Sequence, residues 1–303
     1  MNINITDLIF HNETAAVKHI FNSRWPDGEP TCPHCGSTRT REMGGKTQAG
    51  YWLCNDCRDK FTVRTGTVME RSHVPLHKWL LATHLMAASK KGMSAKQIER
   101  MLGVTYKTAW FLMHRIREAM EGANDTGPLG GPDKIVEADE TFVGGRYGNR
   151  LSGKTAPKKK VLALVERGGR ARSFHVANIH GNTIRAALVT NVDRATTLMT
   201  DEAHHYKAVG REFTRHGHIL HAGRQFAKGD IHSNGAENFF SILKRGVIGT
   251  YHHWSAAHMH RYLAEFSLRY STKGNTDGQR AATILKGMEG RRLTYRRTGL
   301  LAA

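Results

Sequence analysis

All four cysteines of the chain stand in two short motifs, Cys32-x-x-Cys35 and Cys54-x-x-Cys57, and no other feature constrains the fold as much. A C-x-x-C turn aims two thiolates at one point, and two such turns complete a closed tetrahedral four-sulfur site. The gap between the pairs falls in the range of about 15–20 residues that is typical of zinc ribbons. Glycines and aromatic residues between the pairs suit short hairpins. We therefore predict a zinc ribbon over residues 31–70, in which these four cysteines hold a structural Zn²⁺ ion.

Two other uses of the cysteines remain open, a pair of disulfides or a redox C-x-x-C motif. A disulfide framework requires an oxidising compartment. The first residues, MNINITDLIFHNETAAV, contain neither a basic region nor the apolar core of a signal peptide, so export is not indicated. His34 lies inside the first motif, where we expect it to be a bystander. Zinc in a ribbon stabilises a fold and does not imply zinc chemistry.

The charge balance of the chain indicates a polyanionic partner. Lys and Arg number 45 against 26 acidic residues, which gives a formal charge of +19 and a pI of about 10.1 over 303 residues. Such an excess favours nucleic acid or an anionic membrane surface. No apolar run approaches the roughly 18–20 residues of a membrane span. We therefore expect double-stranded DNA as the partner and a bacterial cytoplasm, in association with the nucleoid, as the location.

The region after the ribbon has the pattern of a DNA-reading module. Residues 1–30 predict a short helical lead-in, and residues 73–90 predict an amphipathic helix. Ser94 can cap a helix over Ala95–Met101, Gly103 can form the turn, and Thr105 can cap a second helix over Tyr106–Met120. This order is typical of a helix–turn–helix, which we place in residues 71–122. The residues expected to face base edges are Tyr106, Lys107 and Thr108. Any two-helix hairpin with a glycine turn can imitate this pattern.

Residues 123–133 read as a linker, after which strands alternate with helices. The predicted strands are Ile135–Val143, Val161–Glu166, Ser173–Ile179, Thr197–Thr200 and His218–His221. The predicted helices are Asn182–Asn191, Ala203–Val209 and one that begins near Asn234. This order indicates an α/β domain with a hairpin-led mixed sheet, over residues 134–272.

Two basic segments accompany that domain. A glycine-rich loop between the first two strands ends in Lys158, Lys159 and Lys160, for which we expect contacts with DNA phosphates without base preference. The tail, residues 273–303, is basic, and we expect it to be irregular. A mobile terminus and a phosphate-binding terminus are both compatible with its composition.

Three acidic residues far apart in the sequence form a candidate metal site. Asp139 lies in a predicted strand, Asp201 ends another, and Glu237 lies on a predicted helix that also carries Asn234 and Lys244. Carboxylates at strand ends and on a covering helix can converge and hold two Mg²⁺ or Mn²⁺ ions, an arrangement suited to phosphodiester chemistry. In this arrangement Asn234 is an outer-shell residue or DNA contact. Lys244, and its neighbour Arg245, would contact phosphate.

Neighbouring side chains compete for these roles. Acidic residues at loop ends are common, and Glu140 and Glu202 stand directly beside Asp139 and Asp201. A Glu and a Lys on one face of a helix are often no more than a solvated surface. His205 and His232 are further candidates to line the site.

Several stretches of the chain resemble a known family, in this order: CPHCGS, YWLCNDCRDKFTVRTGTVME, HVPLHKWLLA, EADETFVGG, LMTDEAHHY, HSNGAENFFSILKRGVIGTYHHW and RRLTYR. They look like the zinc-ribbon insertion-sequence transposases with a DDE-type catalytic domain, of insertion-sequence group fifteen-ninety-five (ISXO2-like transposases). The resemblance covers nearly all of the chain. The motifs around Asp139, Asp201 and Glu237 are specific, whereas the helix–turn–helix pattern is generic.

This resemblance implies an RNase H-like fold and a transposase that binds terminal inverted repeats, cleaves DNA at the element ends and transfers the 3′-OH into target DNA. It implies that Asp139, Asp201 and Glu237 are the catalytic triad, and that at least a dimer joins two DNA ends. Some members use an Asn in the third place, so Asn234 is an alternative to Glu237. We prefer Glu237 because a carboxylate binds a hard dication better than an amide does.

Two other functions share parts of this pattern. A non-catalytic DNA-binding regulator would need the ribbon and the helix–turn–helix but not the carboxylates with Lys244. An RNase H-like nuclease specific for DNA structure would cut without joining.

Overall fold

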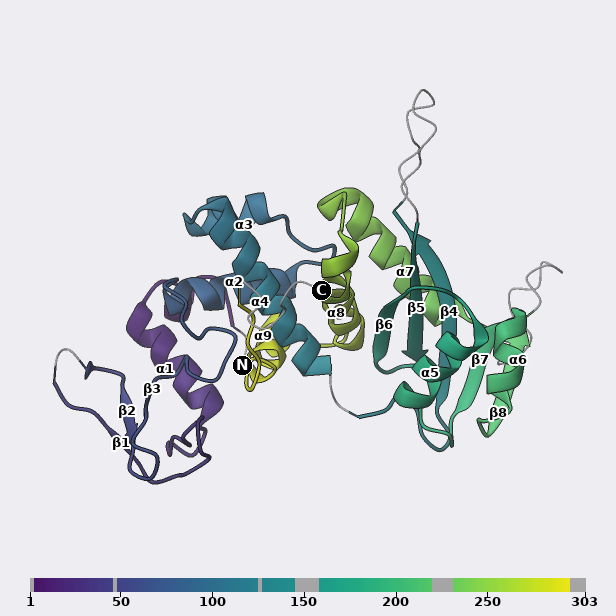
Figure 1. The fold of residues 1–303 in the computed structure, drawn as a ribbon. Helices are drawn as coiled ribbons and strands as arrows, with labels where there is room; N and C mark the ends of the chain where they lie inside the picture. The colour runs from purple at the N-terminus through teal and green to yellow at the C-terminus, as the bar shows by residue number, and fades with distance from the viewer. Residues whose placement is uncertain (1–2, 46–47, 125–126, 145–157, 220–230, 295–303) are drawn as a thin grey trace, which may run out of the picture. The chain divides into compact units, whose positions relative to one another are not determined.

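The computed structural model describes residues 3–45, 48–124, 127–144, 158–219 and 231–294 (Figure 1). The chain divides into two compact units. The first combines Met1–Ser89, Met93–Ala123 and Gly274–Ala303, and the second combines Lys90–Gly92 with Asn124–Lys273. The first unit therefore joins segments from both ends of the chain, whereas the second is built almost wholly from one continuous middle segment.

A small antiparallel sheet in the first unit carries the cysteine motifs. Its order is β1-β2-β3, with β1 at Thr40–Glu42, β2 at Trp52–Cys54 and β3 at Lys60–Phe61. The second strand ends at Cys54, so the turn that follows holds the second C-x-x-C motif. Phe61 is buried at the end of β3. Hairpins of this size are marginal on their own, so further interactions are needed to stabilise them.

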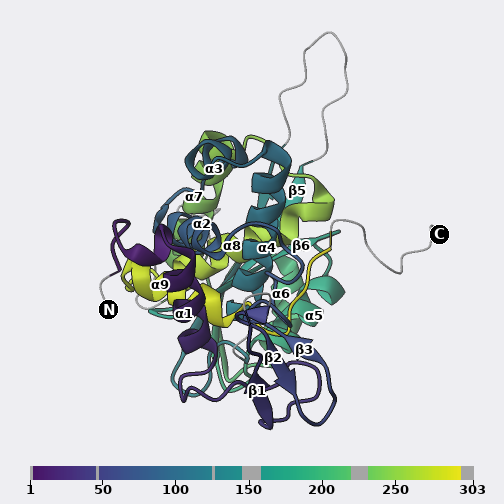
Figure 2. The same ribbon diagram turned by 90° about the vertical axis from the view of Figure 1, so that its left-hand side faces the viewer.

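The rest of the first unit is helical. Its elements are the 3₁₀ helix η1 (Leu8–Phe10) and the α-helices α1 (Glu13–Arg24), α2 (Leu76–Ala88), α3 (Ala95–Leu102), α4 (Tyr106–Asn124) and α9 (Asp277–Lys286). Figures 1 and 2 show α1, α2 and α9 side by side, and all three pairs of these helices are in contact. Buried Ile20, Trp79 and Ile284 supply apolar side chains from the three helices. None of the helices described, in either unit, combines the length and apolar character needed to cross a membrane.

Helices α3 and α4 both begin where their sequence predicts. The Ser94 hydroxyl accepts a hydrogen bond from the backbone N–H of Gln97 at 3.1 Å and caps α3. Gly103 ends α3 with a left-handed backbone, φ +60°, which costs glycine little. The Thr105 hydroxyl accepts from the N–H of Thr108 at 3.3 Å at the start of α4. The second helix runs to Asn124, past the predicted end at Met120 and into the predicted linker.

The C-terminal segment corrects a prediction, because residues 277–286 are not irregular. They form α9, whose first turn carries a capping box in which Thr276 and Gln279 satisfy each other's backbone N–H groups. Ala281 and Ile284 are buried, and Arg280 donates to the Ala87 carbonyl oxygen at the end of α2. The Thr-x-x-Gln spacing is visible in the sequence, but the basic composition of the segment obscured it.

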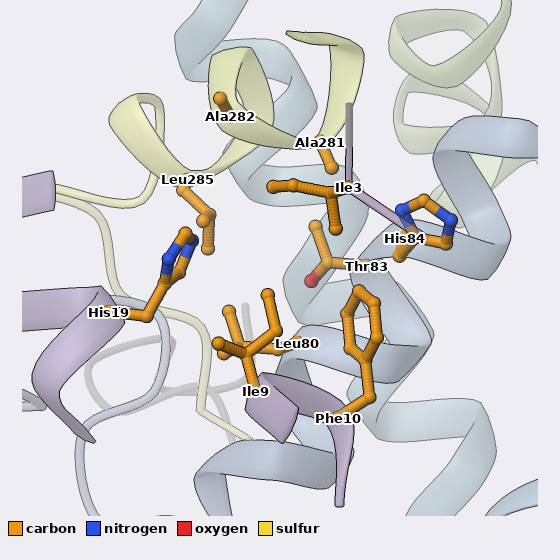
Figure 3. A pocket seen from close by; sticks show the side chains of 10 residues that line it. All are labelled: Ile3, Ile9, Phe10, His19, Leu80, Thr83, His84, Ala281, Ala282 and Leu285. Atoms are coloured by element: carbon orange, nitrogen blue, oxygen red, sulfur yellow. The ribbon is translucent and has the colours of Figure 1, made fainter. Parts of the chain in front are cut away.

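A small apolar hollow lies inside the helical part of the first unit (Figure 3). Side chains from η1, α1, α2 and α9 line it, including Phe10, His19, Leu80, His84 and Leu285. Burial lowers the pKa of both histidines, so they are neutral at pH 7. The hollow measures about 10 Å³, which is no larger than one water molecule needs.

The second unit contains a five-stranded mixed sheet of order β6-β5-β4-β7-β8. The strands are β4 (Ile135–Val143), β5 (Lys159–Glu166), β6 (Ala171–Val176), β7 (Thr197–Asp201) and β8 (Arg215–Ile219). The first three pair antiparallel, while β7 runs parallel to β4 and β8 runs parallel to β7. The change from antiparallel to parallel pairing therefore occurs at β4, the central strand, which carries Asp139.

Helices cover both faces of this sheet (Figure 1). On one face lie α7 (Asn234–Gly246) and α8 (Ala256–Ser271), which bury Phe239, Leu243 and Phe266 against odd-numbered residues of β5. On the other face lie α5 (Gly181–Asn191) and α6 (His204–Gly210), packed on even-numbered residues of β4 and β5. Successive side chains of a strand point to opposite faces. In β4 and β5, odd-numbered residues therefore face α7 and α8, and even-numbered residues face α5 and α6.

The predicted element order holds in the second unit, with local differences in the bounds; strand β5, for example, begins at Lys159 instead of the predicted Val161. Strand β6 begins and ends earlier than the predicted Ser173–Ile179, and β8 begins earlier than the predicted His218–His221. The shift of β8 arises because pairing with β7 sets the register, with Thr197 opposite Arg215, while the sequence RHGHI has no apolar alternation. A helix that the pattern did not predict, α8, follows the π-helical turn Val247–Tyr251.

Candidate metal centres

Two matching turns present the cysteines. Gly36 and Arg58 each follow the second cysteine of a pair, and both have a left-handed backbone, with φ of +78° and +64°. Their N–H groups donate to the carbonyl oxygens of Cys32 and Cys54 at 2.9 and 3.1 Å. Each pair is therefore held by a local turn that needs no distant contact to form.

The four sulfurs fit one tetrahedral metal ion. The Sγ atoms of Cys32 and Cys57 are 3.7 Å apart, and those of Cys35 and Cys54 are 3.6 Å apart. With Zn–S bonds of about 2.3 Å, a tetrahedral site requires sulfurs about 3.8 Å apart, whereas a disulfide would bring them to about 2.0 Å. The backbone N–H of Cys57, aided by that of Asp56, lowers the pKa of the Cys54 thiol to about 6 despite burial. All four sulfurs lie within 4.8 Å of one another, so these residues can hold the ion; His34 is not part of the group.

The sheet brings Asp139 and Asp201 together. Glu137 on β4 lies opposite Met199 on β7, in parallel register. Two residues further along both strands stand Asp139 and Asp201, whose side chains therefore project from the same face. Oxygen atoms of Asp139, Glu140 and Asp201 lie within 4.8 Å of one another. Carboxylate oxygens that share a Mg²⁺ ion lie about 3–4 Å apart, so small side-chain rotations would let the group bind a cation.

The electrostatics of Asp139 reflect this crowding. Burial raises the pKa of its carboxyl group to about 7, and the negative charges of Asp201, Glu140 and Glu237 add to the effect. The Glu140 N–H, which donates to Asp139 Oδ1 at 2.7 Å, opposes it. Repulsion among carboxylates of this kind is relieved when a divalent cation binds between them. The site is therefore suited to a cation and unfavourable without one.

Glu140 projects from the opposite face of the sheet to Asp139. Its even number places it on the side of α5 and α6, where its carboxylate is 2.7 Å from Nε2 of His205. Burial raises the pKa of Glu140, while the His205 contact lowers it. The structure thus joins Glu140 to the acidic group but commits one of its oxygens to α6.

Helix α7 carries the predicted third ligand. Glu237 lies in the first turn of α7, on the face that Asp139 and Asp201 share, and its side chain is exposed. It is near enough for its charge to raise the pKa of Asp139, but it is not among the acidic side chains within 4.8 Å of one another. Asn234, the first residue of α7, is also exposed. Both side chains are therefore accessible, and the charge of Glu237 reaches Asp139.

The predicted phosphate contacts occupy varied settings. Lys244 is exposed in the last turn of α7, whereas Arg245 bends back onto Ser241 of the same helix. Lys158 is exposed, and residues 145–157 of its loop lie outside the described part of the chain. Lys159 donates through Nζ to the Trp254 carbonyl oxygen, and Lys160 donates to that of Ala177 at 3.1 Å. Each ammonium group keeps further N–H donors beside the one used here.

The residues predicted to read bases lie in the first unit, at the start of α4. Tyr106 is 52% exposed, and Lys107 is exposed beside it. Thr108 is half-buried, and its hydroxyl lies 2.9 Å from that of Thr105. The helix start therefore presents Tyr106 and Lys107 to solvent, while Thr108 serves the capping turn.

The contacts of two residues, Glu137 and His216, were not predicted from the sequence. Glu137 is fully buried and contacts the first turn of α7. The only sign of this role in the sequence VEADE is an acidic residue between two apolar ones. His216 lies 2.9 Å from the Thr200 hydroxyl, and burial lowers its pKa. Among the described residues only the cysteine and carboxylate groups have metal-binding geometry, so the histidines there form no further metal site.

Comparisons with known proteins agree with these two centres. Residues 128–271 match the family described as the ISXO2-like transposase domain, and residues 11–60 match the transposase zinc-ribbon domain. A relative from Halobacterium salinarum is described as an uncharacterized protein in transposable element ISH50. It is 28% identical over 297 residues, which cover 91% of this chain and 97% of the relative. The matched regions contain all four cysteines and the three predicted acidic ligands.

Proposed function

Because two regions of this chain match the transposase zinc-ribbon domain and the ISXO2-like transposase domain, we propose that it is an insertion-sequence transposase that cuts and joins DNA. It binds the terminal inverted repeats of its element, hydrolyses the phosphodiesters at the ends and transfers the freed 3′-OH groups into target DNA. The second unit is the RNase H-like catalytic domain. The observation that carries this proposal is the pair Asp139 and Asp201, side by side on adjacent parallel strands beneath α7.

Asp139 and Asp201 would hold the divalent ions, with Glu237 as the third ligand and Asn234 as the alternative. Two Mg²⁺ or Mn²⁺ ions, when bound, would activate the attacking water or 3′-OH and would stabilise the departing 3′ oxygen. The face of the sheet under α7 orients the two aspartates, and Glu140, although near them, has one carboxylate oxygen 2.7 Å from Nε2 of His205. Lys244, Arg245 and Lys158–Lys160 then contact phosphates around the site.

The first unit supplies DNA recognition in this proposal. The four cysteines hold Zn²⁺ and fix the ribbon, and α3 and α4 act as a helix–turn–helix. Exposed Tyr106 and Lys107 would enter the major groove, with Thr108 behind them. The charge of +19 supports a large phosphate contribution to binding. Joining two element ends requires at least a dimer in the DNA complex.

A strand-transfer assay with pre-cleaved element ends tests the proposal. We expect Asp139→Asn and Asp201→Asn to abolish Mg²⁺-dependent joining while end binding, measured by gel shift, is unchanged. Full joining activity in either variant would remove that residue from the mechanism. Cutting without joining by the unmodified protein would instead identify a nuclease, and metal-independent binding alone would identify a regulator.

A pair of substitutions on α7 tests whether Glu237 or Asn234 is the third metal ligand. Glu237→Gln keeps the size of the side chain and removes its charge, and Asn234→Ala removes the amide. If Glu237 is the ligand, the first change abolishes joining and the second reduces it only modestly. The reverse order of effects would assign Asn234.

A further inference from the structure

Glu137 is an acidic residue in the catalytic unit that the proposed chemistry does not use. It stands two residues before Asp139 on β4, on the same face of the sheet, and its side chain is fully buried. Burying a carboxylate is costly unless it is paired and hydrogen-bonded. The hydrogen-bond partners of Glu137 therefore indicate its role.

Those partners lie at the N-terminus of α7. Glu137 Oε2 accepts hydrogen bonds from the backbone N–H groups of Gly235 and Ala236, at 2.6 and 3.0 Å. Helix N-termini have N–H groups without intrahelical partners and a positive electrostatic end, so they favour a carboxylate. Ser233, the residue before the helix, makes no side-chain capping hydrogen bond. Glu137 thus caps α7 from a neighbouring strand.

Arg167 completes the arrangement from the end of β5. Its Nε donates to Glu137 Oε1 at 2.7 Å, and its Nη2 donates to the carbonyl oxygen of His232 at 2.9 Å. The Nδ1 atom of His232 is 3.3 Å from Glu137 Oε1. One carboxylate and one guanidinium therefore bind both the approach to α7 and its first turn.

This network leaves Glu137 no place for a metal ion. Both of its oxygens already accept hydrogen bonds, one from Arg167 and the other from two backbone amides. It is not among the acidic residues that the geometry groups as a metal site. Its role is therefore contact with α7 and not coordination.

Gly235 shows how close the approach is. A Cβ atom at this position would lie 2.8 Å from Glu137 Oε2 and 3.3 Å from a methyl carbon of Val165. Any larger residue would push the carboxylate or the helix start away. Glycine at this position is required by the contact and not by backbone conformation, since Gly235 is not among the residues with positive φ.

We propose that Glu137, together with Arg167, is a positioning residue that fixes the height and rotation of α7 over the sheet. The inference rests on the proposed function, in which Glu237 or Asn234 binds the same metal ions as Asp139 and Asp201. Both residues lie within one turn of the Glu137 contact. Each residue of a helix advances by about 100°, so a slip of one position would turn the ligand away from the aspartates.

The first test follows α7 in the metal-free and DNA-free protein. We expect Glu137→Gln, which places an NH₂ group against existing donors, to speed hydrogen–deuterium exchange of residues 232–240 by at least tenfold. Exchange of β5 should change much less. Unchanged protection of residues 232–240 would overturn the proposal, whatever the reaction of the protein is.

The second test measures Mn²⁺ binding by calorimetry. Loss of positioning should weaken Mn²⁺ affinity by about 10–100-fold, the range typical of residues that orient metal ligands. Wild-type Mn²⁺ affinity in a folded Glu137→Gln protein would contradict positioning. Strand transfer is measured in parallel; if the wild-type protein joins no DNA, the proposed function fails, while the exchange and Mn²⁺ results still decide the role of Glu137.

A matched control exists in the same unit. Glu265 on α8 is equally buried, lies 2.5 Å from Arg269 in an ion pair, and accepts from the Tyr251 hydroxyl at 2.6 Å. Glu265→Gln should lower general stability but leave Mn²⁺ affinity unchanged. Equal loss of Mn²⁺ affinity in both variants would show that burial of any charge is responsible and would overturn the specific role of Glu137.

A second variant keeps the test decisive if Glu137→Gln does not fold. Gly235→Ala introduces the steric conflict from the helix side and should reproduce the faster exchange and weaker Mn²⁺ binding. Adding Glu137→Asp, which shortens the carboxylate side chain, should recover part of both losses. Additive effects of the two substitutions would show that the residues do not act on each other and would refute the proposed contact.

Discussion

The cysteine cluster and the acidic cluster are both suited to metal ions, yet they are assembled in different ways. Each cysteine pair occupies one turn, closed by a hydrogen bond from Gly36 or Arg58 to the first cysteine of the pair. Asp139 and Asp201 instead come from separate strands, and Glu237 comes from a helix above them. The first cluster depends on local backbone geometry, whereas the second depends on sheet register and on the placement of α7.

The largest expected effect separates the two centres by their metals. Removing the ribbon metal with a thiophilic chelator, or substituting Cys54→Ser, should unfold the ribbon, because structural zinc contributes on the order of 10 kcal/mol. Hydrogen exchange should accelerate in residues 31–61 and remain slow in β4. One zinc per chain is expected by metal analysis, and Asp201→Asn should not change it. A ribbon that keeps its protection without metal would show that its hairpins are stable alone.

The next effect tests which face of the sheet carries the acidic centre. Glu237→Gln should lower strand transfer by about 100-fold or more, and Glu140→Gln by less than about tenfold, because Glu140 contacts His205 on the far side. Joining rates with pre-cleaved ends measure both. Equal losses would place Glu140 in the metal site and remove the distinction between the two faces.

A smaller effect concerns stability and pH. The pKa of Asp139 rises from 3.8 to about 7, first through burial and then through the charge of Asp201, so the folded protein holds this proton more tightly than the unfolded chain. The associated stability is fully present below pH 3.8 and is lost as the pH rises through 7. Asp139→Asn should therefore stabilise the Mg²⁺-free protein at pH 8 by roughly 2 kcal/mol.

Urea dependence of hydrogen exchange in β4, at pH 8 and at pH 5, measures this gain. The advantage of Asp139→Asn should shrink at the lower pH and disappear when Mg²⁺ binds the unmodified protein. A variant that is less stable than wild type at pH 8 would show that Asp139 is not strained by its neighbours.

The smallest effect lies within the ribbon. Gly36→Ala should destabilise the first turn by about 1 kcal/mol, since residues with a Cβ atom disfavour the left-handed backbone. Arg58→Gly should be neutral or slightly stabilising, because the second turn already bears that cost. Zinc affinity in competition with a chelator reports both changes. Unchanged zinc affinity in Gly36→Ala, or weaker zinc binding in Arg58→Gly, would show that distant contacts, and not local geometry, hold the cysteines.

Prediction from the sequence succeeded where local patterns were strong. The bounds of β4, the caps of α3 and α4 and the grouping of the cysteines follow from alternation, capping residues and motif spacing. It failed where tertiary contacts decide the structure. Strand β8 gains its register from β7, and α9 is buried against α2 despite a basic composition.

The sequence alone determined that four thiolates meet in a ribbon, and it carries the motifs that match the ISXO2-like transposase domain and the transposase zinc-ribbon domain, because short spacings and contiguous motifs carry that information. Only the tertiary structure decided which acidic residues share a face. The alternation of side chains along β4 sends Glu140 toward α6 and Asp139 toward α7, and the register with β7 sets Asp201 beside Asp139. It also showed Glu137 at the entrance of α7, a contact between residues nearly one hundred positions apart that no local pattern encodes.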